Sequence, residues 1–192
     1  MEINNIESNY SGQTERELSN GSKLLEKMKP IYRGIVRIQN KEETGYDYET
    51  LSEVDMPTNE QIGEYLGAKV EYLHDLIDKG REKHNIGRQR ELEQAEMRAD
   101  LARKTLSGEA DRPDLVVAEF VGLSMTCEKE SVNYPQWRDM LESDSKYFRK
   151  LAETVAGRLG GGPVPDKVPG AIDSEVYHVT FLGTHATKKM KV

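Results

Sequence analysis

Hydrophobic positions recur at helical spacing in the stretch that follows Pro57. They are Ile62, Leu66, Val70, Leu73 and Ile77. One face of a helix would carry all of them. Thr58 and Gln61 have the spacing of a capping box immediately before this pattern, and Gly80 is placed to end it. The pattern therefore predicts an amphipathic helix with a glycine, Gly67, inside it.

A second amphipathic pattern runs from Gln89 to Leu106, and small side chains dominate its inner face. The positions of that face are Leu92, Ala95, Ala99, Ala102 and Leu106. A surface of small residues lets a second helix approach closely. We therefore expect this helix to pack lengthwise on another helix and to join copies of the chain into an oligomer.

A proline is expected to interrupt helical structure in the N-terminal part of the chain. A short helix over Lys23–Met28 is expected to stop at Pro30, because proline lacks an amide donor and disfavours a helical residue before it. The following segment, Ile31–Gln39, fits either an edge strand or a helix, and its isoleucine spacing favours the helix.

Two further helices are predicted in the C-terminal half. Pro113 suits the first turn of a helix, so helix is favoured over strand for the segment that follows it. Another helix begins near Asn133–Pro135. Its inner residues are Trp137, Leu141, Phe148, Leu151 and Val155.

The chain ends in two segments of different character. Glycine and proline dominate Gly157–Ile172, which predicts a linker or an extended crossing segment. Alternating apolar positions then predict a strand over Glu175–Gly183. The fold class expected is mainly α with a short C-terminal β element. Its parts are a mobile arm (1–21), a helical domain (22–83), a central oligomerising region (84–159), a linker (160–173) and a strand with a basic tail (174–192).

Composition narrows the functional classes. The 192 residues carry 27 Lys+Arg against 34 Asp+Glu, a net charge of −7, and 36% of them are hydrophobic. No apolar run is long enough for a membrane span and no secretory signal opens the sequence, which predicts an intracellular, cytoplasmic protein without a membrane partner. Cys127 is the one cysteine, and the four histidines lack helical ligand spacing, so neither a metal nor a cofactor is expected.

The window Asn59–Asp78 resembles a helix-turn-helix. Gly63 stands at the small site of its first helix and Gly67 at the turn, where positive φ is needed. The apolar sites of the motif are filled by Ile62, Leu66, Ala68, Leu73 and Leu76. A single capped helix, bent at Gly67, would have the same spacing, and that alternative stays open.

A basic stretch follows this window and suggests contact with nucleic acid. Side chains of the second helix would face the groove of duplex DNA while the basic stretch holds the phosphates. The predicted DNA-binding residues are Gln61, Lys69, Tyr72, His74, Arg81, Lys83, Arg88 and Arg90. Acidic neighbours such as Glu71 and Asp75 oppose this role. Several weak units on an oligomer would gain avidity.

The order of parts resembles that of phage small terminase subunits, the ring-forming proteins that select viral DNA for packaging. The matching stretches are Pro57–Gly80, Gln89–Gly160 and Glu175–Gly183. The resemblance implies a DNA-binding motif, ring-forming helices and a C-terminal segment shared between subunits. The competing hypothesis is a helical assembly or adaptor protein, viral structural proteins included, that binds other proteins without nucleic acid.

One short motif resembles an enzyme's. His178 and Thr180 have the spacing of a half-motif of two-histidine phosphoesterases, where the pair would hold a phosphate. Such enzymes need a second copy from a distant strand, and His185 with Thr187 lies too near in sequence to supply it. We therefore expect no catalytic residues and a protein that acts by binding.

Overall fold

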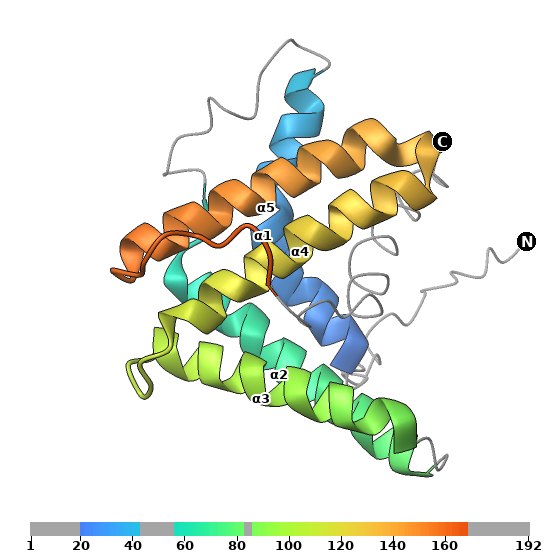
Figure 1. Cartoon of the computed structure of the whole chain (residues 1–192), viewed down its shortest axis with the longest axis vertical. Coiled ribbons are helices and arrows are strands. Elements are labelled where there is room, and N and C mark those ends of the chain that lie inside the picture. Colours follow the sequence, from blue (N-terminus) through green and yellow to red (C-terminus); the bar gives the residue numbers. More distant parts are fainter. Residues whose placement is uncertain (1–19, 43–55, 83–85, 169–192) are drawn as a thin grey trace, which may run out of the picture.

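The computed structural model describes residues 20–42, 56–82 and 86–168, and within these ranges the chain is helical (Figure 1). The elements are α1 (Asn20–Glu42), α2 (Asn59–Glu82), α3 (Ile86–Leu106), α4 (Pro113–Asn133), the 3₁₀ turn η3 (Pro135–Trp137) and α5 (Arg138–Arg158). The mainly α class is confirmed. The described ranges contain no strand, and the predicted C-terminal strand and N-terminal arm lie largely or wholly outside them.

Helix α1 continues through Pro30, so the predicted stop there is wrong. Leu24, Met28 and Ile31 are fully or almost fully buried on one face of the helix. A proline inside a helix costs about 3 kcal/mol. Burying three such side chains contributes about 1.5–3 kcal/mol each, which outweighs that cost. The helix favoured for Ile31–Gln39 is confirmed.

Helix α2 begins as its capping box predicts. The Thr58 amide donates to Gln61 Oε1 at 2.9 Å, and the Gln61 amide donates to Thr58 Oγ1 at 3.2 Å. The helix then runs unbroken through Gly67 and past Gly80 to Glu82. The two-helix geometry expected of a turn at Gly67 is therefore absent, and the single-helix alternative describes this segment.

Helices α2 and α3 pack lengthwise, as the small side chains of α3 predict. Ala99 and Ala102 are buried in this contact region, and a Cβ at Gly67 of α2 would make only an ordinary contact with Arg103 Cδ, at 3.5 Å. The small side chains of α3 thus permit the close approach. A glycine at positive φ, Gly108 (79°), follows α3 and turns the chain towards α4.

Helix α4 is the central element of the fold. Apolar residues surround it, and Phe120, Val121 and Cys127 are completely buried. It packs most extensively against α5, which returns beside it after the short η3 turn (Figure 1). The helix predicted after Pro113 is confirmed. So is the inner face of α5 at Leu141, Phe148, Leu151 and Val155, whereas Trp137 is only partly buried.

Helix α1 connects the two helix pairs. It packs against both α2 and α5, and Tyr147 Oη of α5 donates a hydrogen bond to the Ile31 carbonyl at 2.7 Å. In Figure 1, α4 and α5 lie side by side above the α2–α3 pair, with α1 crossing behind them. Buried side chains from all five helices form one cluster, so the described parts of the two predicted regions, 22–83 and 84–159, share a core.

Candidate functional site

Gln61, Lys69, Tyr72 and His74, four of the predicted DNA-binding residues, lie on α2, and each makes contacts inside the chain. Gln61 closes the capping box. Lys69 is buried, and its Nζ lies 2.6 Å from Glu119 Oε1 of α4. The Tyr65 hydroxyl donates to the same carboxylate oxygen at 2.6 Å. Tyr72 is buried as well, so Lys69 and Tyr72 serve the contacts of α2 with its neighbours inside the chain.

His74 is exposed, and acidic side chains surround it. Its Nδ1 lies 2.9 Å from Glu96 Oε1, and its Nε2 lies 3.6 Å from Asp78 Oδ2. Carboxylates at these distances repel phosphate groups from this part of the α2 surface.

The basic stretch lies where α2 passes into α3. Arg90 is exposed and Arg88 is partly buried at the start of α3. The backbone of Arg81 belongs to the last turn of α2, whereas Lys83 lies outside the described residues. The structure thus places two of the four basic side chains and leaves their proposed phosphate contacts untested.

The small-residue face of α3 is occupied within the chain. Leu92, Ala99 and Ala102 are buried, and Ala95 and Leu106 pack partly buried against the same core. Their neighbour is principally α2. Close packing of this face is therefore observed within the chain, and its role in joining copies of the chain stays a prediction.

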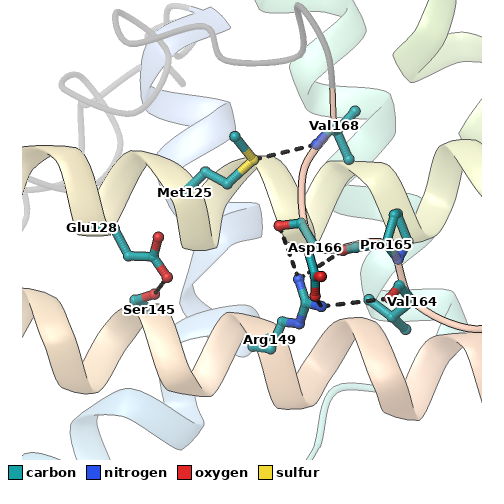
Figure 2. Close-up of polar contacts among 8 residues, drawn as sticks. All are labelled: Met125, Glu128, Ser145, Arg149, Val164, Pro165, Asp166 and Val168. Carbon is teal, nitrogen blue, oxygen red and sulfur yellow. Dashed lines mark hydrogen bonds and ion pairs between the residues drawn. The ribbon is translucent and has the colours of Figure 1, made fainter.

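A segment after α5 forms the most distinctive feature of the described surface. Residues 161–168, which we call the strap, leave the end of α5 and cross α5 and α4 without helix or strand structure (Figures 1 and 2). Val164 and Val168 pack partly buried against the core. The Val168 amide donates to Met125 Sδ of α4 at 3.4 Å. The extended crossing segment predicted from glycine and proline is confirmed over these residues.

The side chain of Arg149 on α5 binds mainly the backbone of the strap. Its guanidinium donates to the Pro165 carbonyl at 2.7 Å and to the carbonyls of Asp166 and Val164 at 3.4 and 3.5 Å. It also bonds Asp166 Oδ1 at 3.1 Å (Figure 2). The planar guanidinium presents several donors at once, which suits it to carbonyl oxygens that point to a common place.

A polar pocket of about 600 Å³ lies beside the strap, between α4 and α5. Ser124 and Ser145 are buried there with their hydroxyl oxygens 2.9 Å apart, and Ser145 Oγ donates to Glu128 Oε1 at 3.1 Å. The remaining lining residues are Lys146, Arg149, Lys150, Glu153 and Asp166. The lining contains three cationic side chains and three carboxylates, so it can bind groups of either charge.

The described residues offer no metal centre, because they contain no group of three or more histidine, cysteine, aspartate or glutamate side chains suited to one. Burial, reinforced by the nearby Asp144 carboxylate, raises the pKa of the Tyr147 hydroxyl above its ordinary value. That hydroxyl therefore stays protonated as a donor to the Ile31 carbonyl. Within the described part of the chain, no helix has the length and apolar character needed to cross a membrane.

Arg149, which binds the strap, was not among the residues singled out in the sequence. The only signal was the segment Gly160–Gly162 with the prolines after it, which marks an extended stretch but does not say what holds it. The His178 and Thr180 pair and its second copy lie outside the described residues. No family model matches the chain, and neither a curated protein nor a solved structure is detectably similar to it.

Proposed function

We propose that the protein is a helical assembly protein that binds extended polypeptide on the surface of α4 and α5 that the strap crosses, around Met125 and Arg149, which we call the α4–α5 groove. The observation that carries this proposal is the grip of Arg149 on three successive backbone carbonyls of the strap. A helix pair that binds one extended segment of its own chain has the means to bind an equivalent segment from elsewhere.

The contacts divide into a general and a selective part. Hydrogen bonds from a charged guanidinium are stronger than neutral ones, and backbone carbonyls occur in every peptide. Val164 and Val168 add apolar contacts four residues apart. Pro163, Pro165 and Lys167 are exposed between and beside them. The groove therefore recognises an extended backbone together with two apolar side chains.

Binding of duplex DNA is the second candidate, favoured by exposed Arg90 in the basic stretch. The burial of Lys69 and Tyr72 and the carboxylates around His74 weigh against readout of a DNA groove by α2. DNA binding that weakens with salt, and that is lost when Arg81, Lys83, Arg88 and Arg90 become alanine, would support this candidate instead.

The proposal is tested with a fluorescent peptide that copies residues 161–168. The receptor is the full-length chain with Val164→Ser and Val168→Ser, which weakens its own strap and leaves the groove intact. We expect saturable binding by fluorescence anisotropy, about tenfold tighter than to the unmodified chain, because the tethered strap competes at a high effective concentration.

Two controls make this measurement specific. Adding Arg149→Ala to the receptor removes charge-assisted hydrogen bonds worth about 1.5–3 kcal/mol, so affinity falls by about tenfold or more. A peptide in which both valines are serine binds weakly to every receptor. If the receptor retains native circular dichroism and yet binds neither peptide, the proposed function is wrong.

A further inference from the structure

We infer that the strap of one chain docks in the α4–α5 groove of a second copy, so that two copies associate by exchanging residues 161–168. This inference rests on the proposed function and names the partner of the same groove. Every copy carries both the segment and the groove, and exchange of an identical element is a low-cost route to a symmetric dimer.

The contacts made by residues 164–168 of the strap are all available to an exchanged copy. Arg149 and Met125, on α5 and α4, bind its backbone from carbonyl 164 to amide 168. Val164 and Val168 pack on the same core. None of these groups belongs to the turn that joins the strap to α5. A strap from a second chain therefore forms the same bonds without any new surface.

The turn at the end of α5 decides which groove the strap reaches. Gly160 has φ +64°, in the left-handed region that favours glycine. The amide of Gly161 then donates to the Ala156 carbonyl at 2.9 Å, which folds the chain back on its own helix. Rotation about the backbone of Gly160 opens this turn and directs the strap away from its own groove.

Concentration sets the balance between the two arrangements. A strap joined to its own helix by a short connection acts at an effective concentration of the order of millimolar. Self-docking therefore dominates in dilute protein as long as the turn at Gly160 is undisturbed. A substitution that disfavours the turn penalises self-docking, and an exchanged strap that leaves α5 by another path escapes that penalty.

The first test compares two valine substitutions in the connection between α5 and the strap, which we call the hinge. Gly160→Val opposes positive φ, which disfavours the turn for any residue with a Cβ. Gly162→Val is the matched control, because Gly162 lacks positive φ and its Cβ would meet no atom within 4 Å. Sedimentation equilibrium should give a dimer dissociation constant for Gly160→Val about tenfold lower than for Gly162→Val.

The second test uses two full-length chains that are defective in complementary ways. One carries Arg149→Ala and keeps its strap, and the other carries Val164→Ser with Val168→Ser and keeps its groove. Each chain alone should sediment as a monomer, and their mixture should form a one-to-one complex. Adding Val164→Ser and Val168→Ser to the Arg149→Ala chain should abolish that complex.

The outcomes separate this inference from the proposed function. A mixture that stays monomeric, or equal self-association of the two hinge variants with native circular dichroism, overturns strap exchange. If the strap-defective chain still binds the peptide of residues 161–168 in that case, recognition of extended polypeptide stands and only the identity of the partner is wrong. Loss of peptide binding as well overturns both.

Discussion

Lys69 illustrates how burial changes the role of a charged residue. In the sequence it stands between Ala68 and Val70, and the helix-turn-helix hypothesis placed it on a DNA-facing surface. In the structure it pairs with Glu119, which also accepts a hydrogen bond from Tyr65. Removing two charges from water is costly, and their attraction offsets this cost only while both partners are present. The polar link between α2 and α4 at Glu119 therefore depends on both residues of the pair.

We predict that Lys69→Ala lowers the free energy of unfolding by about 3 kcal/mol, because it leaves the largely buried Glu119 carboxylate without its cation. The double change Lys69→Met with Glu119→Leu should recover most of this loss. Urea denaturation followed by circular dichroism measures both effects.

Lys79→Ala is the matched control for this prediction. Lys79 forms an exposed pair with Asp75 one turn away, at 2.7 Å. Exposed helical pairs of this kind contribute about 0.3–0.5 kcal/mol. Equal stability of the Lys69→Ala and Lys79→Ala chains would contradict a structural role for the buried pair.

The helices differ in how far the sequence predicts them. Periodic apolar positions predict α2, α3 and α5. In each of these segments the apolar residues recur at helical spacing along the whole helix, and such a face must be buried. Local signals at Pro30 and Gly67 were misleading, because burial of Leu24, Met28 and Ile31, and close packing of α3 on α2, outweigh the local preference for a break.

The strap groove was less predictable than the helices. Glycine and proline predicted an extended segment, but three of the four acceptors bound by Arg149 are backbone carbonyls, and the types of residues 164–166 do not reveal them. The turn at Gly160, which folds the chain back on α5, brings the segment to this arginine. A contact of this kind depends on tertiary structure and has no local periodicity.

We predict that Pro30→Ala stabilises the protein. Alanine restores the amide donor that proline lacks inside α1 and removes the clash of the ring with the preceding turn, a gain of up to about 3 kcal/mol in the free energy of unfolding. Thermal unfolding should show a higher melting temperature.

Pro135→Ala provides the comparison for that change. Pro135 opens the η3 turn, where its amide would lack a helical partner in any case, and it is exposed. We expect no stabilisation at this position. A Pro30→Ala chain that is no more stable than Pro135→Ala would mean that α1 already accommodates its proline without cost.

At the scale of the molecule, α4 and α1 join the helices into one folding unit. Helix α4 packs against α3 and α5, and α1 packs against α2 and α5. The buried cluster runs through all five helices without a break between the predicted N-terminal and central regions. A small domain with one core generally unfolds in a single cooperative step.

We therefore predict that urea unfolds the described helices together. Far-UV circular dichroism reports all of them, while fluorescence reports Trp137, the single tryptophan, which stacks on Tyr134 at the junction of α4 and α5. The two transitions should coincide. Phe120→Ala removes a large buried side chain of α4, and both probes should report the same loss of about 3–5 kcal/mol in the free energy of unfolding. Transitions that separate would reveal two independent units.

The grip of Arg149 on carbonyl oxygens has an evolutionary consequence. Because Arg149 binds mainly backbone carbonyls, most side chains of the strap have little effect on its binding. Substitutions at Pro163, Pro165 and Lys167 should therefore be tolerated during evolution, while the two apolar positions stay four residues apart. Homologues whose straps share no recognisable motif would then remain interchangeable. Their relationship would be detectable from the four-residue spacing of the two apolar strap residues and from one arginine on the helix before the strap.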